Sequence, residues 1–278
     1  MAHGEMKIKS YDSLNLYTQW WKPRASPKAT ILFVHGAFEH SGRYTDLAEK
    51  FAQSGYNFYA FDLRGHGKSE GESLFISSFE SLIKDLEVFS AFVRQNEPDV
   101  PFFLMGPSAG AVISIAYILT CRPAFIKGAI FSATALQLDS GISSLIRSFS
   151  GLLGRIFPRL RLKKINTEYI CRDKRVVADY NNDPLVRKEG LPAHSAFEFL
   201  RWLKKISDKL EKFIIPVLIL HGTGDTITNI QGSRDFYGNC GSTDKVFKEY
   251  PGFYHDLFHE PGNELVLSDI ISWLEAHE

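Results

Sequence analysis

Five short, continuously apolar stretches separated by helical sequence constrain the fold of this 278-residue chain more than any other feature. They begin at residues 29, 56, 101, 127 and 217 and read ATILFVHG, YNFYAFDL, PFFLMG, KGAIFSAT and VLILHG. Strands buried on both faces of a parallel sheet have this pattern, because neither face contacts water. The stretches 43–55 and 78–98 have helical character and end at Gly55 and Pro98. The sequence therefore predicts an α/β fold, with a mainly parallel sheet and helices on both faces.

Two regions depart from this alternation of strands and helices. Residues 6–23 alternate apolar and polar side chains around a turn at residues 11–13, which predicts an antiparallel hairpin. Between residues 136 and 212 the sequence is helical or irregular and contains no strong strand run. We therefore expect a core formed by residues 1–135 and 213–278, with a helical cap, or lid, inserted at residues 136–212.

The first part of the expected cap combines an apolar helical face with basic charge. Apolar residues recur at helical spacing over residues 142–160, six basic residues lie within residues 147–164, and residues 140–167 contain no acidic side chain. Such a segment either packs over a pocket as a lid or rests on a membrane interface. The second alternative predicts peripheral contact between the cap and an anionic membrane.

Composition excludes several other classes of protein. The chain has 32 basic and 32 acidic residues, so its net charge does not indicate a nucleic-acid partner. No stretch of about 18 apolar residues occurs and the N-terminus has no apolar signal region, which predicts a cytoplasmic protein. Three widely spaced cysteines predict free thiols. No grouping of side chains has metal-ligand spacing, so we expect neither a metal nor a cofactor.

The sequence GPSAG at residues 106–110 has the spacing of the G-x-S-x-G turn, which presents a serine at the end of a strand. It follows the apolar stretch at residue 101 and precedes a helical stretch at residues 109–121, which is the context that this turn requires. The unpaired N–H groups at the start of a helix suit a developing oxyanion. Ser108 is therefore the candidate nucleophile, and a tight turn of small residues without chemistry is the alternative.

A serine nucleophile needs a base and a carboxylate that orients the base. Asp225 follows the apolar stretch at residue 217, and His255 lies in the loop after the next expected strand. The carboxyl ends of parallel strands lie at one edge of a sheet, so Ser108, Asp225 and His255 should converge there. Their order along the chain, Ser, Asp, His, is that of α/β-hydrolases. For His66, His221 and His259 we expect structural roles.

Six segments spread over nearly the whole chain read FVHGAFEHSGRY, FDLRGHGKSEG, GPSAG, NDPLV, LILHGTGDTIT and YPGFYHDLFHE. Together they resemble the monoacylglycerol lipase and lysophospholipase branch of the α/β-hydrolases, in the serine aminopeptidase S33 family. The resemblance implies an α/β-hydrolase fold with a cap after its sixth strand. Carried over to this chain, it implies Ser108 as nucleophile, Asp225 as orienting acid, His255 as base, the backbone N–H groups of Ala37 and Ala109 as oxyanion hole, and Phe38, Glu39 and His40 as substrate-binding residues.

Three residues depart from the pattern of this family. Pro107 stands where the family has histidine, Ala109 where it has methionine, and Phe38 where it has glycine. Proline tolerates the extended backbone needed before the serine, and the N–H of Ala109 does not depend on its side chain. Phe38 is expected to crowd the site and to narrow or redirect the path of the substrate.

The expected function is hydrolysis of a single-chain lipid ester, such as a monoacylglycerol or a lysophospholipid, through an acyl-enzyme intermediate. A short-chain carboxylesterase or thioesterase and a peptidase on the same scaffold are enzymatic alternatives. A lipid-binding α/β-hydrolase whose turn is impaired by Pro107 is the non-catalytic alternative.

Overall fold

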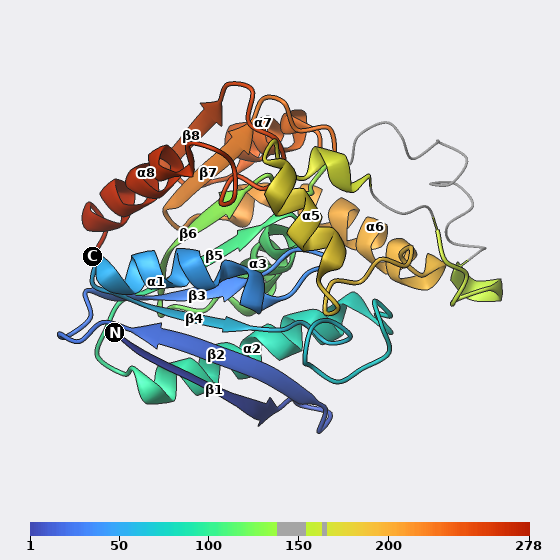
Figure 1. The fold of residues 1–278 in the computed structure, drawn as a ribbon, viewed down its shortest axis with the longest axis horizontal. Helices are drawn as coiled ribbons and strands as arrows, with labels where there is room; N and C mark the ends of the chain where they lie inside the picture. The colour runs from blue at the N-terminus through green and yellow to red at the C-terminus, as the bar shows by residue number, and fades with distance from the viewer. Residues whose placement is uncertain (138–153, 163–165) are drawn as a thin grey trace.

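An eight-stranded sheet with strand order β1-β2-β4-β3-β5-β6-β7-β8 forms the centre of the computed structural model, which describes residues 1–137, 154–162 and 166–278 (Figure 1). The strands are β1 Ala2–Lys9, β2 Asn15–Lys22, β3 Ala29–Val34, β4 Tyr56–Phe61, β5 Phe102–Pro107, β6 Ile126–Ser132, β7 Val217–Gly222 and β8 Lys245–Tyr250. Strands β3 to β8 pair in parallel with one another, whereas β1 and β2 form an antiparallel hairpin, and β2 pairs antiparallel with β4. The predicted parallel sheet and N-terminal hairpin are confirmed.

Helices cover both faces of the sheet, and alternate residues of each central strand point into two separate cores. The α-helices described are α1 Thr45–Gln53, α2 Phe79–Asn96, α3 Ser108–Cys121, α5 Lys174–Asn182, α6 Ala193–Ser207, α7 Ile230–Asn239 and α8 Asn263–Glu275. The 3-10 helices described are η1 Ser41–Tyr44, η2 Thr167–Tyr169 and η3 Leu210–Lys212. In β3, Leu32 and Val34 lie in the core that includes α2 and α3, whereas Ile31 and Phe33 lie in the core with α1 and α8.

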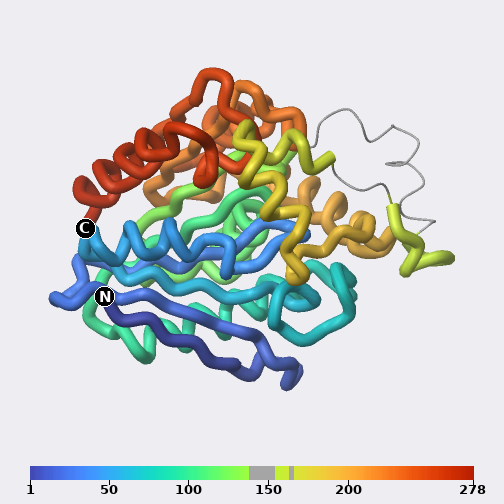
Figure 2. The backbone as a smooth tube through the Cα atoms, in the orientation of Figure 1, coloured from blue at the N-terminus to red at the C-terminus, as the bar shows by residue number. Residues whose placement is uncertain are grey.

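Residues 154–162 lie at one end of the molecule, and both termini lie at the other end (Figure 2). Helix α6 packs against α2 and α3, and its buried residues Trp202 and Ile206 belong to the same core as those helices. The division of the chain into core and cap at residues 136 and 212 stays a proposal. Cys121, Cys171 and Cys240 form no disulfide, as predicted.

Part of the predicted amphipathic segment lies outside the described residues, namely residues 142–153 with Arg147, and Lys163 and Lys164. Residues 154–162, yellow-green at the right edge of Figure 1, begin with one helical turn. Arg159 pairs with Glu72 through three hydrogen bonds of 2.8, 2.9 and 3.2 Å, and Arg161 donates to the carbonyl of Ser73. These two arginines therefore fasten the segment to the loop between β4 and α2. Within the described ranges, no helix is long and apolar enough to cross a membrane.

Candidate active site

Ser108 occupies the sharp turn between β5 and α3, at the carboxyl edge of the sheet. Its φ angle of 50° lies in the left-handed region, which side chains other than glycine rarely adopt. Pro107 has the extended angles φ −88° and ψ 156°, the type of backbone conformation that the position before the serine requires. A Cβ atom at Gly110 would lie 2.0 Å from the carbonyl oxygen of Val34, which explains why the turn needs glycine there. The sequence GPSAG thus forms the strained turn that its spacing predicts.

Asp225 lies in the turn after β7, and its side chain is completely buried. Its Oδ1 accepts hydrogen bonds from the N–H groups of Ile227 and Thr228, at 2.8 and 3.0 Å, and its Oδ2 accepts from the hydroxyl of Thr228 at 2.7 Å. Burial opposes ionisation, but the neighbouring His255 and His221 outweigh it and lower the pKa of Asp225. The side chain is therefore a fixed carboxylate at neutral pH.

His255 lies in the loop after β8, with its Nδ1 2.8 Å from Asp225 Oδ2. This loop reaches Asp225 because residue 222 is glycine: a Cβ there would lie 2.3 Å from the carbonyl oxygen of Phe253. The carboxylate accepts the proton of Nδ1, which leaves the lone pair of Nε2 available as a base. Burial opposes the charged imidazolium, but Asp225 outweighs it and raises the pKa of His255. The structure thus brings together two of the three predicted catalytic residues in the required orientation.

Ser108 and His255 are joined through the segment that follows β6. Ala135 N–H donates to the carbonyl of Ser108 at 3.3 Å, and the hydroxyl of Thr228, 3.4 Å from His255 Nδ1, also contacts the carbonyl of Ala133. Among the residues that the structure describes, Ser108 Oγ has no hydrogen-bond partner and does not contact His255 in this way. The predicted hydrogen bond between Ser108 and His255 is therefore not formed in this structure.

The two backbone N–H groups predicted for an oxyanion hole have no acceptor among the described residues. Ala37 lies in the loop after β3, outside any helix or strand. Ala109 is the second residue of α3, where helix geometry supplies no acceptor. The carbonyl of Phe38, next to Ala37, accepts from the N–H of Arg187 at 2.7 Å. Both N–H groups are thus free to receive an oxygen atom of a ligand.

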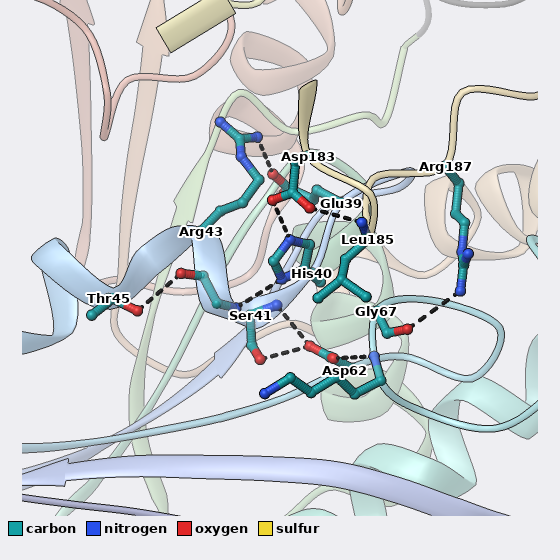
Figure 3. A network of polar contacts seen from close by, with 12 residues as sticks. Glu39, His40, Ser41, Arg43, Thr45, Asp62, Gly67, Asp183, Leu185 and Arg187 are labelled. Atoms are coloured by element: carbon teal, nitrogen blue, oxygen red, sulfur yellow. Dashed lines mark hydrogen bonds and ion pairs between the residues drawn. The ribbon is translucent and has the colours of Figure 1, made fainter. Parts of the chain in front are cut away.

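Phe38, Glu39 and His40 occupy the same loop but differ in their surroundings. Figure 3 shows Glu39 and His40. Phe38 is partly exposed and has a φ angle of 71°, the left-handed conformation that glycine adopts more readily. Glu39 is buried and accepts from Gly36 N–H and Tyr44 Oη, each at 2.7 Å. His40 is also buried, with Nε2 2.9 Å from Asp183 Oδ2. The contacts of Glu39 and His40 hold the loop in place, and direct binding of substrate by the three residues stays a prediction.

Several polar residues around the site were not identified from the sequence. Arg43 contacts both Glu39 and Asp256, and Asp256 pairs with His259 Nδ1 at 2.8 Å. The sequence does contain one indication of the contact between Arg43 and Glu39. The two residues are four positions apart in the segment GAFEHSGRY, and one helical turn brings such residues together. Its contact with Asp256 joins residues 213 positions apart and has no local signature.

Within the described part of the chain, no group of three or more His, Cys, Asp or Glu side chains is arranged to hold a metal ion. The expectation that the protein needs no metal or cofactor stays a prediction.

A mainly parallel sheet with a strained serine after its fifth strand and an Asp–His pair after its seventh and eighth strands defines an α/β-hydrolase. The chain belongs to the family described as serine aminopeptidase S33, whose model matches residues 25–262.

Similar proteins of known name agree with this assignment. A monoacylglycerol lipase from Mycolicibacterium smegmatis is 30% identical over 92% of this chain and 91% of its own. The crystal structure of a Paleococcus ferrophilus monoacylglycerol lipase is 32% identical, covers 95% of this chain and 99% of its own, and has a TM-score of 0.84. A soluble variant of the Saccharomyces cerevisiae monoglyceride lipase, solved with a substrate analogue, is 25% identical over 100% of this chain and 95% of its own, with a TM-score of 0.89. The present chain is accordingly a hydrolase.

Proposed function

We propose that the chain is a serine hydrolase that cleaves single-chain lipid esters, with Ser108 as nucleophile, His255 as base and Asp225 as orienting acid. The observation that supports this most directly is the 2.8 Å contact between Asp225 Oδ2 and His255 Nδ1 at the sheet edge where Ser108 adopts its strained turn. Hydrogen bonds between catalytic groups are often formed fully only with substrate in place, so the missing Ser108 contact does not oppose the assignment.

The chemistry follows from these positions. As Ser108 Oγ attacks the ester carbonyl carbon, His255 Nε2 accepts the hydroxyl proton, and the N–H groups of Ala37 and Ala109 donate to the oxyanion. The ester C–O bond then breaks, and His255 transfers its proton to the departing alcohol. Water, deprotonated by His255, attacks the acyl-enzyme, and a fatty acid leaves as Ser108 regains its proton.

The substrate class is proposed from the relatives, because those matched over most of the chain are named monoacylglycerol or monoglyceride lipases. Carboxylesterase, thioesterase and peptidase activities would use the same residues. The assay described below distinguishes them from lipid ester hydrolysis. A lipid-binding protein without turnover is the remaining outcome.

We also propose peripheral membrane contact through an apolar cap patch formed by Ile156, Phe157 and Leu160. These side chains are 57, 59 and 48% exposed, and the basic residue Arg155 beside them is exposed as well. Exposed apolar groups next to a cation suit the boundary between lipid headgroups and acyl chains. Such contact would let a lipid ester enter the site directly from the bilayer.

The test compares wild type with Ser108→Ala. Fluorophosphonate labelling and hydrolysis of monoacylglycerol, lysophosphatidylcholine, graded p-nitrophenyl esters and aminoacyl p-nitroanilides are measured. Loss of Ser108 should abolish labelling and lower kcat by about 10⁴-fold or more, because binding and oxyanion stabilisation alone remain.

Ser132→Ala is the matched control, since Ser132 ends the neighbouring strand β6, is buried, and has an Oγ without a partner among the described residues. This variant should keep full activity. Labelling of Ser108→Ala at the wild-type rate would overturn the assignment of the nucleophile, and wild-type protein that binds lipid without turnover would overturn the proposed reaction.

A further inference from the structure

Arg43, a residue of η1 with a largely buried side chain, lies between the two loops that carry the proposed oxyanion donor and the proposed base. Its Nη1 donates to Glu39 Oε2 at 2.9 Å, and its Nη2 donates to Asp256 Oδ2 at 3.2 Å. Figure 3 shows the first of these contacts, with Arg43 directed toward Glu39 above the 39–45 segment. The Arg43 side chain is 8% exposed, so both ion pairs are shielded from water.

On one side, Arg43 acts on the loop that contains Ala37. Glu39 Oε1 accepts from the N–H of Gly36 and from Tyr44 Oη, while its Oε2 accepts from Arg43. Glu39 therefore fixes the backbone immediately before Ala37, whose N–H is the proposed oxyanion donor. Arg43 balances the charge of this buried carboxylate and determines its orientation.

On the other side, Arg43 acts on the loop that contains His255. Asp256 is the next residue, and its Oδ2 contacts both Arg43 and His259 Nδ1. His259 Nε2 lies 2.9 Å from the carbonyl of Arg43, so its two ring nitrogens both face acceptors. Burial opposes a charge on His259, but Asp256 outweighs it and raises the pKa of His259. Two carboxylates, one guanidinium and one imidazole thus alternate within one cluster.

The third side of Arg43 faces the region between β6 and β7. The guanidinium carbon lies 4.5 Å from the ring centroid of Tyr180 in α5, a buried cation–π contact. Asp183, which follows α5, contacts His40 of the same loop as Glu39. Helix α5 thereby closes the cluster and keeps the guanidinium from turning toward solvent.

We infer that Arg43 is a positioning residue of the proposed hydrolase, which holds the oxyanion-donor loop and the base loop at a fixed separation through Glu39 and Asp256. This inference rests on the proposed function. Arg43 does not contact the reacting atoms, and its effect is exerted through the two carboxylates.

The groups that face His255 predict how loss of Arg43 changes its titration. Asp225 and the Thr228 hydroxyl face it from the turn after β7, Asp256 is on its own loop, and Glu39 approaches from the loop after β3. The charges of Asp256 and Glu39 both raise the pKa of His255. Without Arg43, these two carboxylates lose their common counter-charge, and the imidazolium of His255 is favoured further.

The experiment uses Arg43→Gln, Arg43→Lys and Arg64→Gln. Arg64 is the matched control, because it is also a buried arginine with an 8% exposed side chain and two aspartate partners, Asp85 and Asp12. Both Gln variants lose a comparable set of ion pairs, but only Arg43 joins the two loops of the site. Unfolding midpoints are measured first, to show that each variant is folded.

Arg43→Gln should lower kcat for a soluble short-chain ester by about 10²-fold while KM changes little, because the oxyanion donor and the base are displaced relative to each other. The midpoint of the His255 titration, followed by NMR of its ring protons, should rise by about 0.5 pH unit or more. Arg43→Lys keeps the charge but not the two-pronged geometry, so it should restore the titration midpoint more fully than kcat. Arg64→Gln should change neither quantity.

Equal losses of kcat in Arg43→Gln and Arg64→Gln, or an unchanged His255 titration in Arg43→Gln, would show that Arg43 only stabilises the fold. The NMR titration needs no turnover and therefore separates the two proposals. If wild type fails to hydrolyse any ester while the titration still responds to Arg43, the proposed function is wrong and the coupling of Arg43 to His255 stands.

Discussion

Asp225 is contacted by two histidines, which lie in different surroundings. His255 Nδ1 lies 2.8 Å from Asp225 Oδ2, and His221 Nε2 lies 3.2 Å from the same oxygen. His221 is fully buried, with Nδ1 2.8 Å from Ser233 Oγ, so it belongs to the interior behind the site. Both histidines contact the same carboxylate oxygen, so this contact alone does not identify the base. Their positions in the fold distinguish the proposed base, His255, from the structural residue His221.

The protonation of His255 predicts the pH dependence of the proposed reaction. Only neutral imidazole accepts the proton of Ser108, so kcat/KM should rise with pH as His255 loses its proton. Asp225 raises the pKa of His255 above the ordinary value of 6.5, which places the midpoint of this rise above pH 6.5. A pH profile of short-chain ester hydrolysis measures it.

Asp225→Asn should lower kcat by about 10⁴-fold and shift the remaining profile to lower pH, because the amide neither fixes the reactive tautomer nor stabilises imidazolium. Asp235→Asn, at an exposed position in α7, is the control and should leave the profile unchanged. A fully active Asp225→Asn variant would remove this residue from the mechanism.

The segment 154–162 combines two kinds of surface residue with different roles. Arg159 and Arg161 are committed to Glu72 and Ser73, so their charges hold the segment against the loop before α2. Arg159 also lies over the ring of Phe75, with 5.0 Å between the guanidinium carbon and the ring centroid. Reversing these charges would therefore disturb the attachment of this segment as well as any attraction to lipid. The apolar cap patch offers a cleaner test of membrane contact.

Changing Ile156, Phe157 and Leu160 together to Ser should weaken co-sedimentation with anionic liposomes by about tenfold or more, because the apolar area that enters the lipid interface is lost. Hydrolysis of a soluble ester should not change. The same change at Ile214 and Leu265, which are 70 and 57% exposed elsewhere on the surface, is the control. If both sets bind liposomes like wild type, the cap patch is not a membrane contact.

The formal net charge of the chain is zero, but several charged or titratable side chains are buried inside the molecule. His35 and His66 are buried near each other, with ring centroids 5.4 Å apart. Burial is the main reason that the pKa of His66 falls to about 4 and that the pKa of His35 lies well below its ordinary value. Both are therefore neutral in the native state at pH values where the unfolded chain carries them protonated.

The contribution of these two histidines to the free energy of unfolding should decrease on acidification, because below pH 6.5 the unfolded state binds protons at these positions that the native state does not. His255 and His259, whose pKa values are raised, contribute with the opposite sign. A histidine whose pKa falls from 6.5 to about 4 contributes a loss of about 2 kcal/mol between pH 7 and pH 5. Asp225, with its lowered pKa, loses its contribution only below about pH 4 and does not affect this range.

Urea unfolding of wild type and His66→Gln at pH 7 and pH 5 measures the effect, and the variant should show the smaller pH dependence. His3→Gln, at an exposed position, should retain the pH dependence of wild type. Identical pH dependence in all three proteins would contradict a neutral, buried His66.

The strands, the hairpin and the serine turn were predictable from the sequence because each has a local signature. The stretch predicted at residues 101–106 is β5 at Phe102–Pro107, and the turn at residues 11–13 contains Ser13 with a φ angle of 69°. In a parallel sheet the ends of β5, β7 and β8 lie at one edge. The contact between Asp225 and His255 could therefore be predicted from their positions after two of these strands.

Other features were decided only by the tertiary structure. Phe38 adopts a left-handed conformation because its loop is held by Glu39 and by the N–H of Arg187, neither of which marks residue 38 in the sequence. Arg43 lies between Glu39 and Asp256 because two loops from distant parts of the chain approach each other above the sheet. The periodicity and spacing of residues in the sequence indicate which face of a helix or strand is buried. The partner of a buried charge, however, depends on which loops the fold brings together.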